Sequence, residues 1–140
     1  MPISGFFDPS DPAKRPLLNL YVYLPTVDRG AIRTFEIDTG ADMTMLSYQD
    51  RVGLFEPGHE FTNIQSGHGV SGAATYGLET AVLLAHNGGP RDNWFARPAA
   101  LWVALTPAVS PAVSLLGRDF IAATKLYMDI ANGIVTLDPN

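Results

Sequence analysis

The feature that most constrains this fold is a series of short runs with strand character, separated by residues typical of turns. Every second residue from Leu18 to Leu24 is apolar, which is the period-2 pattern of a half-buried strand. Similar runs predict strands at residues 31–37, 61–65, 73–85, 99–105, 113–116, 126–130 and 134–137. Many short strands with turn signals at regular spacing favour a closed or sandwiched β architecture. We therefore expect an all-β fold, a barrel or a sandwich.

Two short helices and two hairpin turns complete the expected secondary structure. The segment from Ser47 to Asp50 fits the capping-box pattern and predicts a short helix ending near Gly53. A second helix of one or two turns is expected at residues 118–124. Asn132-Gly133 predicts a tight turn between the last two strands, and the glycine-rich residues 66–72 predict the tip of another hairpin.

The length of 140 residues predicts a single domain, large enough to bury roughly two-thirds of the surface of its unfolded chain. Residues 1–16 contain four prolines together with Gly, Ser and Asp, so we expect an irregular N-terminal arm there. The domain itself is expected to span residues 17–140.

Composition excludes several classes of function. The net charge is −5 and the sequence has no basic cluster, which argues against a nucleic-acid partner. The absence of cysteine excludes disulfides, zinc–thiolate sites and thiol nucleophiles. The first residues lack the basic and apolar segments of a signal peptide, and no apolar stretch reaches membrane-spanning length. We therefore expect a soluble, cytoplasmic protein without a membrane partner.

Two motifs carry the candidate chemistry. Asp38-Thr39-Gly40 directly follows an apolar-rich predicted strand and is followed by Ala41-Asp42. A second apolar run closed by glycine occurs at residues 114–119, which read Ser-Leu-Leu-Gly-Arg-Asp. Together, in this order and separated by a β-rich stretch, they resemble the retropepsin-like aspartic proteases, the class that includes the retroviral proteases. The resemblance spans about residues 17–137 and implies the acid-protease fold of that class, with one or two short helices.

The resemblance implies an aspartic endopeptidase in which Asp38 is the catalytic residue. In aspartic proteases, two carboxylates about 3 Å apart share a proton, so that one activates a water and the other polarises the peptide carbonyl. This chain has one Asp-Thr-Gly, so the resemblance implies a symmetric homodimer that contributes Asp38 twice. Thr39 and Gly40 would shape the active-site loop. Ala41 replaces the Ser or Thr of pepsin and so removes a donor that would favour the ionised dyad. We therefore expect activity nearer neutral pH than pepsin's.

The same resemblance assigns residues around the dyad. Arg118 would form an ion pair with Asp42 and brace the loop, while Gly40 and Asp42 would contact the backbone of the substrate. Gly69-Val70-Ser71-Gly72 matches the tip of the mobile flap that closes over bound peptide. The substrate would be an extended polypeptide held by main-chain hydrogen bonds.

Other interpretations of these residues remain open. The same fold could be a catalytically silent module that binds an extended peptide or a partner protein, or a monomer that assembles only with a related chain. Residues 67–72 satisfy the pattern G-x-G-x-x-G, but no helix-forming sequence follows, so dinucleotide binding is not expected. Residues 69–73 fall one glycine short of a nucleophile elbow.

No metal or cofactor is expected. The three histidines, His59, His68 and His86, lack metal-ligand spacing, and we expect solvated side chains in loops. Asp38 and Asp42 lack the alternating oxygen ligands of a calcium loop. Asp119 is interpreted as a helix-start residue favoured by the helix dipole.

Overall fold

The computed structural model describes residues 2–69, 72–86, 94–107 and 113–139 of the chain. The strands are β1 (Ile3–Ser4), β2 (Phe6–Phe7), β3 (Pro16–Leu24), β4 (Arg29–Ile37), β5 (Met45–Leu46), β6 (Ile64–Gly69), β7 (Gly72–His86), β8 (Trp94–Ala104), β9 (Ser114–Leu116), β10 (Lys125–Asp129) and β11 (Ile134–Asp138). The helices are a 3-10 turn, η1 (Gln49–Arg51), and one α-helical turn, α1 (Arg118–Ile121). The expectation of a mostly β fold with short helices is confirmed.

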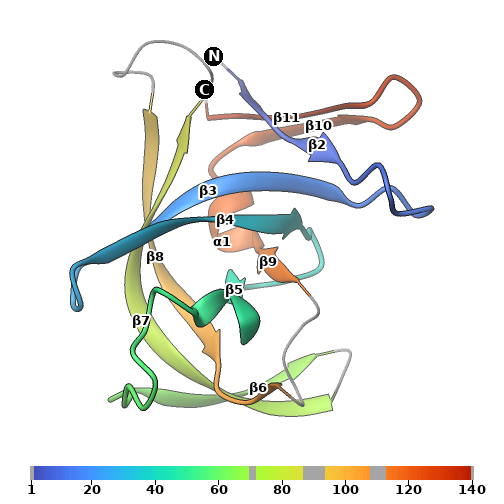
Figure 1. Cartoon of the computed structure of the whole chain (residues 1–140). Helices are drawn as coiled ribbons and strands as arrows, with labels where there is room; N and C mark the ends of the chain where they lie inside the picture. The colour runs from blue at the N-terminus through green and yellow to red at the C-terminus, as the bar shows by residue number, and fades with distance from the viewer. Residues whose placement is uncertain (1, 70–71, 87–93, 108–112, 140) are drawn as a thin grey trace.

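Most of the strands close into a barrel (Figure 1). The larger sheet has the order β2-β3-β4-β9-β5-β8-β7-β6, and an additional β3–β7 pairing closes a ring from β3 round to β7. Tyr21 to Tyr23 of β3 pair with Val82 to Leu84 of β7 at this seam. Most neighbours are antiparallel, but β4 pairs with β9 and β5 pairs with β8 in parallel. The expected closed β architecture is therefore correct.

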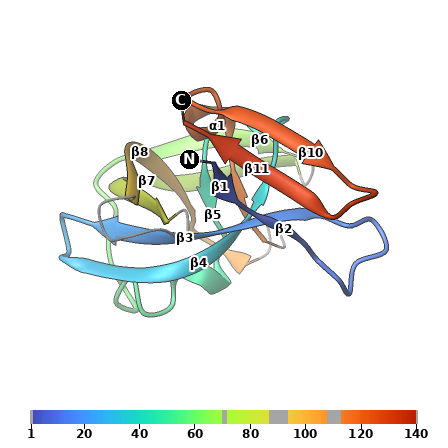
Figure 2. The same ribbon diagram turned by 90° about the horizontal axis from the view of Figure 1, so that it is seen from above.

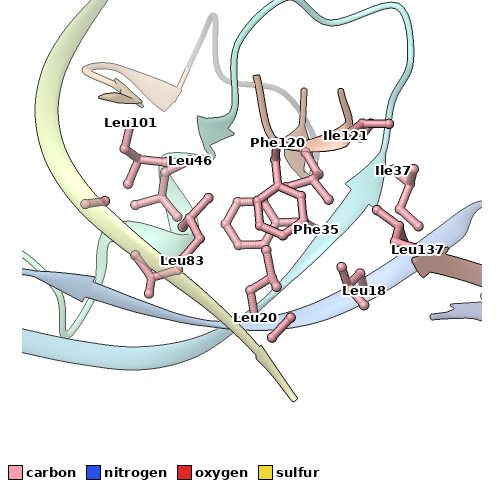
Figure 3. Close-up of a cluster of buried hydrophobic side chains, with 14 of the residues drawn as sticks. Leu18, Leu20, Phe35, Ile37, Leu46, Leu83, Leu101, Phe120, Ile121 and Leu137 are labelled. Carbon is pink, nitrogen blue, oxygen red and sulfur yellow. The ribbon is translucent and has the colours of Figure 1, made fainter. Parts of the chain in front are cut away.

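The core of the barrel follows from the alternation along each strand. Leu18, Leu20, Val22 and Leu24 of β3 are all buried, as their period-2 spacing predicts. They meet residues of β4, β7 and β8 inside the ring, and Phe120 of α1 enters the same cluster (Figure 3). Through this contact α1 packs against the core of the barrel, and the packing holds the segment that follows β9 in place.

A second, three-stranded sheet of order β1-β11-β10 lies beside the barrel (Figure 2). Ile3 of β1 pairs with Leu137 of β11 and is 2% exposed, and Phe6 of β2 pairs with Leu17 of β3. The expectation of an irregular arm over residues 1–16 is therefore corrected, because two short strands anchor this segment. The final hairpin is present, but the tight turn predicted at Asn132-Gly133 is corrected, because four residues lie between the paired Asp129 and Ile134 and Gly133 alone of them has a positive φ, +68°.

The glycine-rich hairpin is formed by β6 and β7, which pair from Ile64↔Gly77 to Gly69↔Gly72. Its second arm continues to His86, one residue past the predicted end, while the first arm begins at Ile64 instead of residue 61. Val70 and Ser71 lie outside the described residues. Phe61 precedes the strand, and the space beside Gly77 is filled by its ring.

Three smaller expectations are corrected. The predicted capping box at Ser47 gives only a 3-10 turn, in which the Asp50 amide donates to Ser47 Oγ at 3.3 Å. The helix after β9 ends at Ile121 and not at residue 124. His68 and His86 lie in β6 and β7, so the expectation that they occupy loops is wrong. Within the parts of the chain that the structure describes, no helix is long and apolar enough to cross a membrane.

Candidate active site

Asp38 lies at the point where β4 ends beside β9. Ile37, the last residue of β4, pairs in parallel with Leu116, and the Asp38 amide donates to the Leu116 carbonyl at 3.0 Å. The two sequence motifs, separated by more than 70 residues, are therefore adjacent in space. Parallel pairing of β4 and β9 places the residues that follow both strands at the same edge of the sheet.

The residues after Asp38 form a tight loop closed on the aspartate itself. The Gly40 amide donates to Asp38 Oδ1 at 2.9 Å, and the Ala41 amide donates to the Asp38 carbonyl at 3.2 Å. The Asp38 side chain is half-buried, and Thr39 and Gly40 are exposed. A hydrogen bond from the same loop therefore orients the carboxyl group, and the residues that follow it are exposed to solvent.

The segment after β9 packs against this loop along its length. The Arg118 amide donates to the Ala41 carbonyl at 2.8 Å, and the Asp119 amide donates to the Asp42 carbonyl at 3.3 Å. Gly117 is buried, and a Cβ at this position would lie 2.5–2.9 Å from main-chain atoms of Met43. The Leu-Leu-Gly motif therefore has a steric reason for its glycine, because only a residue without a side chain allows the two backbones to come this close.

Arg118 and Asp42 form the ion pair that the family resemblance implies. Their side chains are 57% and 76% exposed, respectively. Exposed ion pairs contribute little to stability, with a median of about 0–1 kcal/mol. The pair can orient the outer side of the loop, but its role in substrate contact stays a prediction.

For two acidic residues beside the loop, the sequence reasoning overlooked Glu36 altogether and gave Asp119 only a role at the start of its helix. Glu36 precedes Asp38 by two residues, and burial raises the pKa of its carboxyl group, with further contributions from Arg15, which lowers it, and Asp38, which raises it. Strand alternation could have placed Glu36 on the face opposite Phe35 and Ile37. Asp119 is the second: its carboxylate accepts hydrogen bonds from Thr44, which no local sequence signal indicates.

The predicted flap residues are only partly described. Gly69 and Gly72 form the last pair of the β6–β7 ladder, so the hairpin extends to the position assigned to the flap tip. Val70 and Ser71 lie outside the described residues. Beneath the hairpin, a Cβ at Gly67 would contact Tyr76 and Trp102 at 3.2–3.3 Å, so this strand lies close over two aromatic rings.

Among the described residues, no group of three or more His, Asp or Glu side chains could hold a metal ion. His59 is not solvated, which corrects the expectation. Its ring lies 4.9 Å from the Phe55 ring and 4.7 Å from the Phe61 ring, and its Nε2 is 3.9 Å from Glu79 Oε2. This histidine belongs to the packing at the base of the β6–β7 hairpin.

Comparison with solved structures identifies a similar fold. A retropepsin-like aspartic protease from Rickettsia conorii superposes with a TM-score of 0.54 and 17% sequence identity, covering 98% of this chain and 87% of that one. No protein-family model and no curated protein matches the sequence. The likeness shows that this chain has a retropepsin-like fold.

Proposed function

We propose that this chain is an aspartic endopeptidase whose active site forms between the Asp38 residues of two identical subunits. The observation that carries the proposal is the position of Asp38. It directly follows β4, donates its amide to the Leu116 carbonyl, and lies in a loop that is hydrogen-bonded to the Gly117–Asp119 segment. The similarity of the whole fold to a protein described as a retropepsin-like aspartic protease supports the same activity.

The proposed chemistry needs two carboxyl groups and one water. Like charges a few ångströms apart do not ionise together, so the pair holds one proton between them. The ionised carboxylate accepts a proton from the water as that water attacks the peptide carbonyl. The protonated carboxyl donates a hydrogen bond to the carbonyl oxygen. Asp38 supplies one such group per chain, which is why the mechanism requires a second subunit.

A symmetric homodimer accounts for the second Asp38. β10 is an edge strand of the three-stranded sheet, and its hairpin carries several exposed large apolar side chains. They are Tyr127, Met128, Ile130 and Ile134. An exposed strand edge with apolar side chains is a surface suited to pairing with another chain. We propose that a second copy of this chain occupies it.

The remaining residues take the roles that the resemblance implies. Thr39, Gly40 and Ala41 form the loop that presents the carboxyl groups, and Arg118 with Asp42 braces its exposed side. The hairpin tip, Gly69 to Gly72, covers the substrate. The substrate is an extended polypeptide, bound through its main chain.

The test compares peptide-library cleavage by the wild type, Asp38→Asn and a matched control, Asp28→Asn. Asp28 lies in the β3–β4 turn at φ +49°, where asparagine is well tolerated, and its carboxylate accepts from the Tyr23 hydroxyl at 2.8 Å. We expect cleavage by the wild type and the control, and none by Asp38→Asn. Equal cleavage by all three would remove Asp38 from the mechanism, and peptide binding without cleavage by the wild type would favour the silent binding module.

A further inference from the structure

The Thr44 side chain, at the end of the active-site loop, is completely buried and hydrogen-bonded on both sides. Its Oγ1 accepts from the Gly117 amide at 3.2 Å and lies 2.7 Å from Asp119 Oδ1. The Thr44 amide donates to the other carboxylate oxygen, Asp119 Oδ2, at 3.1 Å. The Asp119 carboxylate also accepts from the Phe120 amide, at 3.0 Å. Thr44 is thereby joined to the first turn of α1 by two bonds to a single carboxylate.

The direction of each bond in this group is fixed by chemistry. A main-chain amide can only donate, so Thr44 Oγ1 must be the acceptor from Gly117. A hydroxyl has one proton, and that proton must then point to Asp119. The Asp119 carboxylate therefore accepts from three donors, the arrangement that suits an ionised carboxylate. Asparagine at 119 would place its amide nitrogen against the Thr44 amide or, in the flipped orientation, against the Phe120 amide, and either way a donor would face a donor.

The bonds of Asp119 and Thr44 form the inner part of the contact between the loop and the segment after β9, where Thr44 is buried and Asp119 is half-buried. The Arg118–Asp42 ion pair lies on the exposed side of the same contact, where solvent weakens it. Hydrogen bonds to a charged group are stronger than those between neutral groups, and these lie farther from solvent than the ion pair does. Asp38 stands at one end of the loop and Thr44 at the other, so weaker anchoring of Thr44 would loosen the end of the loop opposite Asp38.

We propose that Asp119 is a positioning residue for Asp38, acting through Thr44, and that this buried connection sets the loop geometry more strongly than the Arg118–Asp42 pair does. The catalytic part of this inference depends on the proposed function. Its structural part concerns the loop alone. In an assembled dimer each subunit would contain its own Asp119–Thr44 connection beside its own Asp38 loop. A shift of about 1 Å at a reacting group can cost a hundredfold in rate, so a loosened loop would lower turnover before it affected substrate binding.

The experiment uses Asp119→Asn, Thr44→Val and Thr44→Ser, with Asp28→Asn as the remote control. Thr44→Val keeps the shape and removes the hydroxyl, whereas Thr44→Ser keeps the hydroxyl. For Asp119→Asn and Thr44→Val we expect kcat to fall at least about tenfold, with KM within about twofold. Thr44→Ser should retain most of the wild-type kcat. The second measurement is amide hydrogen exchange of residues 40–44, which should be about tenfold faster in Asp119→Asn and Thr44→Val.

The two measurements separate this inference from the proposed function. An inactive wild type whose loop amides still exchange faster in both variants would support positioning by Asp119 and reject the protease. Wild-type kcat and unchanged loop exchange in Asp119→Asn and Thr44→Val would overturn the inference and leave the protease intact. Equal losses in Thr44→Ser and Thr44→Val, with faster exchange throughout the barrel, would also overturn it, because they indicate general destabilisation. Asp28→Asn should change neither measurement.

Discussion

Replacement of Gly117 by alanine should damage the fold itself, because the obstacle to a side chain there is main chain. The new Cβ would lie 2.5 Å from the Met43 carbonyl carbon and 2.6 Å from its oxygen. Ordinary carbon contacts are about 3.5–4.0 Å, so the two segments must separate by roughly 1 Å. That separation stretches the bonds from Gly117 to Thr44 and from Arg118 to Ala41. Two lost hydrogen bonds at about 1 kcal/mol each, with about 1–3 kcal/mol for overpacking, give about 3–5 kcal/mol.

The prediction is measured by urea unfolding at constant m-value, together with a thermal melt. A loss of this size corresponds to a melting temperature lower by on the order of 10 °C in a domain of this length. Gly133→Ala is the control, because its Cβ would meet nothing within 4 Å. It carries only the strain of a left-handed backbone at φ +68°, about 1–2 kcal/mol. If Gly117→Ala lost no more stability than Gly133→Ala, the steric argument would be refuted.

The other predictions address charge, packing and assembly. Because burial raises the pKa of Glu36, the folded state holds that proton more tightly than the unfolded state. The resulting stability is greatest in acid and is lost as pH rises through the folded-state pKa. The stability of Glu36→Gln relative to wild type should therefore increase from pH 4 to pH 7 in urea unfolding, and a pH-independent difference would contradict this. Gly77→Ala should displace the Phe61 ring, whose atoms occupy the space of the new Cβ, and cost about 1–3 kcal/mol in a thermal melt; wild-type stability would show that the ring relocates freely. Tyr127, which is 56% exposed, can become aspartate without harm to the core. Sedimentation should then show a folded monomer at a concentration where the wild type is dimeric, and a persistent dimer would exclude the β10 surface.

The barrel strands could be predicted because each has one face in the core. Alternation at residues 18–24 marks β3 closely, and the apolar residues Phe35 and Ile37 mark β4. β1 and β5 could not be found in this way, because a strand of two residues has no period. Ile3 is held by its pairing with Leu137, a partner at the other end of the chain. Such strands exist only because the rest of the sheet is already in place.

The candidate site was predictable where its chemistry is local and not where it depends on distant contacts. Asp38 and its glycine form a recognisable motif, and the ion pair of Arg118 with Asp42 followed from the family resemblance. Asp119 was interpreted through its own helix, whose dipole explains an acidic residue at that position. Its partner Thr44 is 75 positions away, and neither residue carries a signal for the other.

Gly117 and Gly40 are glycines for different physical reasons. The reason at Gly117 lies in the fold of one chain, and the reason at Gly40 lies in the proposed function. Gly117 is required by this chain alone, since main-chain atoms fill the space of its side chain. At Gly40, an added Cβ would come within 3.2 Å of Asp38 Oδ1, a side-chain atom that can yield by a few tenths of an ångström. Packing within one chain therefore gives only a weak reason for glycine at position 40. On the proposed function the stronger reason is external: the space beside Gly40 admits the backbone of the substrate and the matching loop of the second subunit. A side chain there should leave the monomer folded and obstruct the assembled site.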